Sequence, residues 1–238
     1  MQLAVASCWA YRDAWKPFFK LLAKFWPNHP PPTIITDMHD GEVIDATTID
    51  GIEYLYEYVP TQVQLFIGES AQTWCSLVAD YAKQQTEPIL LFQEDFFLTA
   101  PVNEAMISHA CGLVQDGIAC VRLYPCPGSD IPSVDPYYGF VSNEADYRIS
   151  CQAAIWNPSY LNRIAAISMG SAASFEISGT IYARTQNDII MACKRDLQPW
   201  PLQYICSGIS RGMWNPDSKR LCDLYGIEND WSMRPFAS

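Results

Sequence analysis

The sequence has few of the residues that support nucleophilic or zinc-dependent catalysis. It contains three histidines in 238 residues, and none of them stands at a recognisable catalytic spacing from a serine or a cysteine. The nine cysteines include no C-x-x-C pair and follow no regular spacing, so the sequence provides neither a zinc-binding pattern nor a disulfide framework. We therefore expect separate, buried thiols in a reducing cytoplasm.

The sequence also lacks the common phosphate-binding motifs and any long apolar run. Neither G-x-G-x-x-G nor a P-loop occurs. The apolar residues 3–8 are too few for a secretory signal, and no run approaches the ~18 residues of a membrane span. The formal net charge of −11 disfavours loose binding to a polyanion. We expect a soluble, cytoplasmic protein with no membrane span.

Apolar runs alternate with amphipathic segments in the first half, which predicts an α/β fold whose strands are mainly parallel. Strands are predicted at 3–7, 33–36, 63–67, 88–93 and 118–123, and helices at 15–26, 74–81 and 106–114. The first strand ends at Ser7 and Cys8, near the place of a nucleotide base in a mononucleotide-binding fold. The acidic segment from Asp37 to Glu57 is expected to be a solvated loop.

The second half begins with a long segment, 124–146, that is rich in proline and glycine. Loops of this length are usually lids or binding loops, and this one contains Tyr137 and Tyr138. A strand is predicted at 149–155, and Asn157-Pro158 is typical of a helix start. We further predict a helix over 180–194, a strand over 202–209, and a helix that follows Asn215-Pro216 and runs through Tyr225.

Two adjacent carboxylates, Glu94 and Asp95, interrupt the apolar stretch 88–98. The residues before them are typical of a strand buried on both faces, and ligands bind beyond the carboxyl ends of such strands. A buried carboxylate needs a cation or hydrogen-bond donors, so the pair suits a divalent metal that holds a phosphorylated substrate. In the alternative interpretation, Asp95 caps a turn and Glu94 pairs with an arginine.

Two further charged residues are candidates for chemistry. Glu176 lies between apolar neighbours, an environment that raises a carboxyl pKa and suits a general base; alternatively, it caps a helix that starts near Gly179. Arg148 follows the long loop and is a candidate to clamp a diphosphate in bidentate fashion. Its alternative is an ion pair with Asp146 or Glu144.

Together these segments resemble a group of bacterial and phage glycosyltransferases of the GT-A fold. The resemblance spans most of the chain and rests on five segments in the same order: Gln-Glu-Asp-Phe-Phe-Leu at 93–98, Arg-Leu-x-Pro at 122–125, Tyr-Arg-Ile-Ser-x-Gln-Ala-Ala-Ile-Trp at 147–156, Phe-Glu-x-x-Gly at 175–179 and Arg-Gly-x-Trp-Asn-Pro at 211–216. It implies one GT-A-like, Rossmann-type α/β/α domain over 1–238. Residues 1–100 would bind the nucleotide sugar, and residues 101–238 would bind the acceptor.

The resemblance implies transfer of a sugar from a nucleotide-sugar donor, with a UDP-sugar as the first expectation, to an unidentified saccharide or other hydroxyl. Asp95 matches the last, metal-binding position of the D-x-D motif, and Gln93 stands at the first position, where an acidic residue is more usual. Mn²⁺ or Mg²⁺ is the implied cofactor, and Glu176 is the implied base in an inverting reaction. The substrate-binding residues are taken to be Ser7, Cys8, Trp9, Glu94, Tyr138 and Arg148.

Three other functions stay open. In the first, the acceptor is a modified base of phage DNA. Nucleic acid would then be a partner only as the acceptor, and the protein would act in the host cytoplasm. A nucleotidyltransferase shares the fold but normally has a glycine-rich, basic loop, whereas residues 6–10 contain neither glycine nor lysine. The third is a non-catalytic module that binds a nucleotide or sugar.

Overall fold

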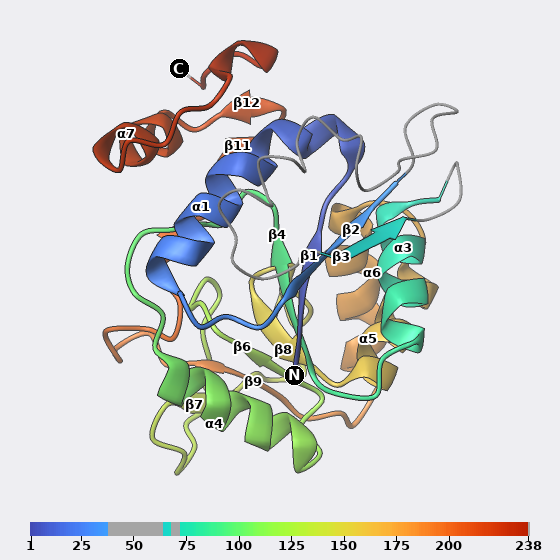
Figure 1. Ribbon diagram of the computed structural model, residues 1–238. Helices are drawn as coiled ribbons and strands as arrows, with labels where there is room; N and C mark the ends of the chain where they lie inside the picture. Colours follow the sequence, from blue (N-terminus) through green and yellow to red (C-terminus); the bar gives the residue numbers. More distant parts are fainter. Residues whose placement is uncertain (38–63, 68–71, 238) are drawn as a thin grey trace.

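Strand β1 (Gln2–Ala6) lies inside an eight-stranded sheet with the strand order β3-β2-β1-β4-β8-β6-β9-β7. The computed structural model describes residues 1–37, 64–67 and 72–237. Four of the pairings, β3-β2, β2-β1, β1-β4 and β6-β9, are parallel. The pairings β4-β8, β8-β6 and β9-β7 are antiparallel. The predicted mixed, mainly parallel sheet is therefore confirmed (Figure 1).

The strands and helices predicted in the first half are confirmed, apart from shifts at their ends, and the structure adds two short elements that the sequence does not predict, at residues 9–14 and 97–98. The strands are β2 (Pro32–Thr36), β3 (Gln64–Ile67), β4 (Ile89–Gln93), β5 (Phe97–Leu98) and β6 (Cys120–Arg122). The helices are η1 (Trp9–Ala14), α1 (Trp15–Phe25), α3 (Trp74–Lys83) and α4 (Glu104–Gln115). Val63 and the acidic residues from Asp40 to Glu57 lie outside the described residues.

In the second half, two helices start as the asparagine-proline pairs predict. Asn157 caps α5 (Pro158–Ser168), and Asn215 caps α7 (Pro216–Leu224), because each asparagine side chain accepts a hydrogen bond from an early helical N–H. The remaining elements are α6 (Ala172–Arg184), η2 (Trp231–Met233) and the strands β7 (Tyr138–Phe140), β8 (Ala154–Trp156), β9 (Ile190–Cys193), β10 (Tyr204–Ile205), β11 (Ile209–Ser210) and β12 (Met213–Trp214).

Three predicted elements of the second half are wrong. The helix expected over 180–194 ends at Arg184, and residues 190–193 form β9 instead. A short, fully buried apolar run fits a helix and a strand equally well by periodicity. The single strand expected over 202–209 is two short strands, and the strand expected over 149–155 is the shorter β8, residues 154–156.

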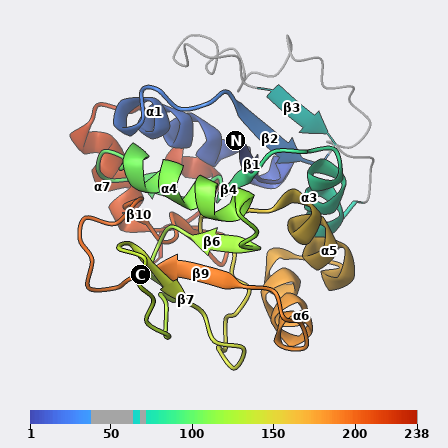
Figure 2. The same cartoon turned by 90° about the horizontal axis from the view of Figure 1, so that it is seen from below.

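Helices cover both faces of the sheet, so the core has two parts. Odd residues of β1, such as Leu3 and Val5, belong to one hydrophobic cluster with residues of α1 and α4, whereas Ala4 and Ala6 belong to a second cluster with residues of α3, α5 and α6. Figure 2 shows these two groups of helices on opposite sides of the strands. Strands buried on both faces read as continuous apolar runs, and this explains why 3–6 and 89–92 carry no polar residue.

The C-terminal part returns to the α1 side of the sheet. Helix α7 lies beside α1 in both views (Figures 1 and 2), where the Phe25 and Tyr225 rings meet edge to face. The backbone N–H of Trp214 donates to the backbone carbonyl of Pro235 at 2.8 Å, and this bond fixes the last residues against the β11-β12 hairpin. Among the described residues, no single helix is long and apolar enough to span a membrane; α5 and α6 reach that length and composition only as a pair bent by 106°.

Candidate functional site

Glu94 and Asp95 form a buried turn directly after β4, at the edge of the sheet predicted to bind ligands. Ala6 of β1 pairs with Gln93 of β4, so the two neighbouring strands end level with each other. Glu94 is 7% exposed and Asp95 is 6% exposed. The chain therefore places two carboxylates almost out of water, where ionisation requires a compensating charge or hydrogen bonds.

Asp95 is held by the segment that leads into the β11-β12 hairpin. Its Oδ2 accepts a hydrogen bond from the Ile209 N–H at 3.0 Å, and its backbone carbonyl accepts one from the Gly208 N–H at 2.9 Å. A Cβ at position 208 would lie 2.7 Å from that carbonyl oxygen, so only glycine allows this approach. Burial raises the pKa of Asp95, and hydrogen bonds from Ser207 and Ile209 oppose the shift.

Glu94 has fewer compensating partners than Asp95. Burial and then the Asp95 charge raise the pKa of Glu94 well above its usual 4.5, and the Arg234 cation opposes the shift. Arg234 itself is engaged elsewhere: its Nε and Nη2 donate to the two Asp13 carboxylate oxygens at 2.7 and 2.5 Å. In the described ranges, no Lys or Arg forms an ion pair with Glu94 or Asp95. Within the described part of the chain, the two carboxylates thus lack a direct cationic partner.

A cavity of about 350 Å³ adjoins the two carboxylates, and we call it the carboxylate cavity. It extends from the ends of β1 and β4 to the N-terminus of α6, where Ser171 caps the helix. The start of a helix favours negative charge, because its first N–H groups have no partner within the helix. Its lining residues are Ser7, Cys8, Tyr11, Trp74, Gln93, Glu94, Asp95, Ser171, Ala172, Ser207 and Ile209.

The structure brings Ser7 and Cys8 to the carboxylate cavity together with Glu94 and Asp95. Ser7 Oγ accepts from Trp15 Nε1 at 2.8 Å, which fixes the hydroxyl at the end of β1. Burial raises the pKa of Cys8 to about 11, so its thiol stays protonated at neutral pH. Trp9 is one residue further along and does not line the cavity; its backbone N–H donates to Asp37 Oδ1 at 2.6 Å.

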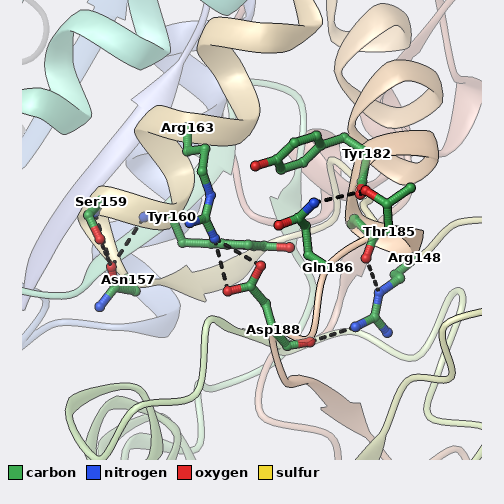
Figure 3. Close-up of polar contacts among 10 residues, drawn as sticks. Arg148, Asn157, Ser159, Tyr160, Arg163, Tyr182, Thr185, Gln186 and Asp188 are labelled. Atoms are coloured by element: carbon green, nitrogen blue, oxygen red, sulfur yellow. Dashed lines mark hydrogen bonds and ion pairs between the residues drawn. The ribbon is translucent and has the colours of Figure 1, made fainter.

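Arg148 does not reach the carboxylate cavity, and its position corrects the predicted diphosphate contact. Its guanidinium is buried and donates to the backbone carbonyls of Val141, Ser142, Ala183 and Asp188 at 2.6 to 3.3 Å. Figure 3 shows it beside Asp188, whose carboxylate pairs with Arg163. Four of its N–H groups are therefore used within the fold. The alternative ion pair with Asp146 is also replaced, because Arg184 forms it.

Tyr138 is the second predicted substrate contact that the structure moves into the core. It lies in β7, is 0% exposed, and donates its hydroxyl hydrogen to Met106 O at 2.9 Å. Its ring stacks on that of His109. The proline and glycine residues around this tyrosine predict a lid, but β7 pairs with β9 and makes that part of the long segment an edge of the sheet.

Glu176 lies in α6 and lines a neighbouring cavity of about 420 Å³ with Tyr147 and Arg184. Its Oε1 accepts from the Cys151 N–H at 2.8 Å and from Ser150 Oγ at 3.2 Å. Within the described residues, no hydrogen bond reaches Oε2. Burial raises the pKa of Cys206, and the charges of Asp95 and Glu176 both add to this shift. The charges of both carboxylates therefore act on the same thiol.

The ligand set available for a metal consists of Glu94 and Asp95. In residues 1–37, 64–67 and 72–237, no three His, Cys, Asp or Glu side chains come together as a complete set. Mg²⁺ and similar ions are commonly held by one or two carboxylates plus substrate phosphates. Two nearly dry carboxylates without a direct cationic partner fit this incomplete kind of site, whereas they do not fit a structural metal cage.

Several residues of the site could not be found from the sequence. Ser207, Ile209 and Arg234 follow Asp95 by more than a hundred positions, and only the folded chain brings them to the ends of β1 and β4. The glycine of the Arg211-Gly212 pair is the sequence signal for a turn at this point. In the structure both residues have positive φ, 52° and 75°, as in a tight hairpin turn. The pair indicates a turn, but nothing in it indicates the contact of Gly208 and Ile209 with Asp95.

Comparisons with known proteins identify the fold. No protein-family model matches the sequence, and no curated protein matches it. The structure of UDP-glucose pyrophosphorylase complexed with UDP-glucose is similar, with a TM-score of 0.55 and 8% identity over 94% of this chain and 97% of that chain. The structure of S. aureus TarS 1–349 in complex with UDP has a TM-score of 0.50 and 14% identity, over 97% of this chain and 67% of that one.

This chain spans 58% and 35% of the lengths of two other S. aureus TarS structures, each with a TM-score of 0.48. At such low identities, the similarity establishes a fold rather than an activity. The chain has a GT-A-like α/β fold with a mixed, mostly parallel central sheet and helices on both faces, as the sequence predicts.

Proposed function

We propose that this chain is a glycosyltransferase that moves a sugar from a nucleotide-sugar donor to a hydroxyl acceptor. The observation that carries the proposal is the pair of buried carboxylates, Glu94 and Asp95, directly after the carboxyl end of the central strand β4 and beside a cavity. Similar structures contain UDP and UDP-glucose, and their fold supports a nucleotide-sugar donor here. A UDP-sugar is therefore the first donor to test.

Each part of the carboxylate cavity has a role in this proposal. The start of α6, with Ser171 and Ala172, would receive the diphosphate, because helix N-termini favour phosphate groups. Ser7 and Cys8 would contact the base at the end of β1. Glu94 and Asp95 would hold Mn²⁺ or Mg²⁺, and the bound ion would supply Lewis-acid stabilisation of the departing diphosphate.

Glu176 is the proposed acceptor base. Its Oε1 is anchored by the Cys151 N–H and the Ser150 hydroxyl, and Oε2 carries no hydrogen bond from the described residues. An anchored carboxylate with one free oxygen can accept a proton from an acceptor hydroxyl in the neighbouring cavity. Asp95 keeps its own orientation through Ile209, so the two carboxylates have separate tasks.

The test measures release of UDP from a panel of UDP-sugars, with and without Mn²⁺. Asp95→Asn should lose at least about tenfold in rate, because removing a metal-binding charge weakens stabilisation of the leaving group. Asp116→Asn is the matched control, because Asp116 is exposed at the end of α4. Equal rates for the wild type and Asp95→Asn would reject the assigned site. Binding of UDP-sugars without any turnover would favour a non-catalytic module.

A nucleotidyltransferase is the second candidate, and the structural similarity to UDP-glucose pyrophosphorylase over 97% of that chain favours it. The absence of glycine and lysine from residues 6–10 favours the glycosyltransferase. The two functions differ in one reactant: the pyrophosphorylase type consumes UDP-glucose only when pyrophosphate is present and then forms UTP. Pyrophosphate-dependent UTP formation would replace our first proposal with this one.

A base of phage DNA is the acceptor in the remaining variant of the proposal. Because the net charge is −11, DNA binding would need a concentrated basic groove. A gel-shift assay at low salt tests this variant, and absence of a shifted band would remove it. A saccharide acceptor predicts that absence.

A further inference from the structure

Arg122 is a buried cation that the fold does not satisfy. It is the last residue of β6 and is 1% exposed. Its Nη1 donates to Tyr147 O at 3.0 Å, but Nε and Nη2 have no hydrogen-bond partner among the described residues. More than nine in ten buried polar groups in proteins have such a partner. An arginine with two unused donors in this position therefore indicates a missing acceptor.

No carboxylate of the described residues neutralises Arg122. Asp130 is the acidic residue whose charge acts on it, yet the two form no ion pair. Both Asp130 oxygens are used by Ser142, whose N–H and hydroxyl donate at 2.7 and 2.8 Å. A guanidinium stays protonated in proteins, so a charge without a partner remains beneath the surface.

Arg122 is one of the residues that line a second cavity, the Arg122 pocket, of about 450 Å³. Arg195 also lines this pocket; it is exposed and forms no ion pair among the described residues. At Gly128, a Cβ would lie 2.8 Å from Arg195 Cγ, so glycine allows this side chain to lie close to the loop. The full lining is Arg122, Pro127, Gly128, Ser129, Asp130, Ala145, Asp146, Tyr147 and Arg195.

The Arg122 pocket lies at the same edge of the sheet as the carboxylate cavity. Leu91 of β4 and Arg122 of β6 both pair with Ala154 of β8, one from each side. Two strand spacings, about 10 Å, therefore separate the Leu91 and Arg122 backbones. Because β4 and β6 are both antiparallel to β8, their carboxyl ends point the same way. The Arg122 pocket is thus distinct from the carboxylate cavity, but the two are close enough for one ternary complex to occupy both.

We propose that the Arg122 pocket binds an oxyanion, a carboxylate or a phosphate group, which pairs side-on with Nε–H and Nη2–H of Arg122. Two parallel N–H groups of a guanidinium match two oxygens of such a group, and Arg195 adds a second positive charge at the rim. This assignment stands without the proposed function. A further step rests on that function: the anion is carried by the acceptor, which makes the acceptor an acidic or phosphorylated saccharide.

The first experiment titrates inorganic phosphate and, separately, acetate into the ¹⁵N-labelled protein without a donor. The Arg122 Nε–H signal, identified by its loss in Arg122→Met, should shift with one of these anions. Arg122→Met should weaken binding of that anion at least tenfold, and Arg195→Ala should weaken it several-fold. Arg220→Ala is the control, because it removes the same charge from an exposed site on α7.

The larger response, to phosphate or to acetate, identifies the group. Unchanged binding in both Arg122→Met and Arg195→Ala, or no shift of the Nε–H signal with either anion, would overturn the proposal. Arg195→Ala and the wild-type titration keep the test valid if Arg122→Met fails to fold. Removal of an uncompensated buried charge should leave the Arg122→Met melting temperature equal or higher, whereas a purely structural arginine predicts a fall.

The acceptor step is tested with glucose 6-phosphate, glucuronate and glucose in the presence of a UDP-sugar. An acceptor role predicts that one of the two anionic sugars has a KM at least tenfold below that of glucose, and that Arg122→Met removes this difference. Equal KM values would reject the acceptor step. If the anion binds through Arg122 but no UDP-sugar is ever cleaved, the proposed function fails while the oxyanion pocket stands.

Discussion

The ion pair between Asp13 and Arg234 allows a quantitative test of how the C-terminal residues are held. The side chains are 1% and 9% exposed, and two hydrogen bonds at 2.7 and 2.5 Å join them. Arg234→Met removes the cation and leaves the Asp13 carboxylate buried without a partner. Breaking a buried pair from one side costs about 3–5 kcal/mol. For a chain of this size, each kcal/mol lowers Tm by about 2–4 °C, so Tm should fall by about 6–20 °C.

Urea unfolding of Asp13→Asn, Arg234→Met and the double variant measures the coupling. The second substitution should cost much less than the first, because the buried charge it would strand is already gone. The exposed pair Asp217 and Arg220 is the control, and Arg220→Met should cost less than about 1 kcal/mol. A loss below 1 kcal/mol for Arg234→Met would show that the pair is solvated, and it would refute the reasoning.

Three further predictions address the candidate site and its surroundings. The raised pKa of Glu94 means that the folded state keeps a proton which the unfolded state releases above pH 4.5, so stability should fall as pH rises from 4.5 through the folded pKa. Tm measured against pH should show a smaller fall for Glu94→Gln, and an equal fall would contradict the burial argument. Gly208→Ala should destabilise by about 1–3 kcal/mol in urea, because its Cβ meets Asp95 O. Gly112→Ala, with open space around it in α4, should be neutral or stabilising; equal losses would refute the steric explanation. Arg148→Met should lower the free energy of unfolding by at least about 3 kcal/mol, because it leaves buried carbonyl groups without a hydrogen-bond donor. The KM of the folded variant for a UDP-sugar should stay unchanged. A raised KM would show that Arg148 contacts the diphosphate after all.

The sequence predicts the first half of the fold well because its strands are buried on both faces. Residues 89–92 are uniformly apolar and are bounded by Pro88 and by two carboxylates, so both the strand and its end are evident. Residues 189–193 are equally apolar but follow a helix without a proline or glycine between them. Only the pairing of β9 with β6 and β7 decides that they form a strand.

The residues of the candidate site also divide into those that the sequence predicts and those that it does not. Ser7, Cys8, Glu94 and Asp95 were predictable as a group, because consecutive parallel strands end at one edge of a sheet. Arg148 was misassigned because an arginine after a loop gives no sign of its acceptors. Those acceptors are backbone carbonyls from three separate parts of the chain, and no side chain in the sequence marks them.

Strand β8 has a consequence for how the molecule assembles. It contributes three residues, 154–156, and among the described strands it is the one that joins β4 to β6 within the sheet. The carboxylate cavity and the Arg122 pocket therefore belong to two blocks of strands that are continuous only after residue 156 has been synthesised and inserted. We expect the amides of Ala154 and Ile155 to exchange with deuterium only through global unfolding. A substitution that weakens the pairing of β8 would therefore change the distance between the carboxylate cavity and the Arg122 pocket without changing a residue of either.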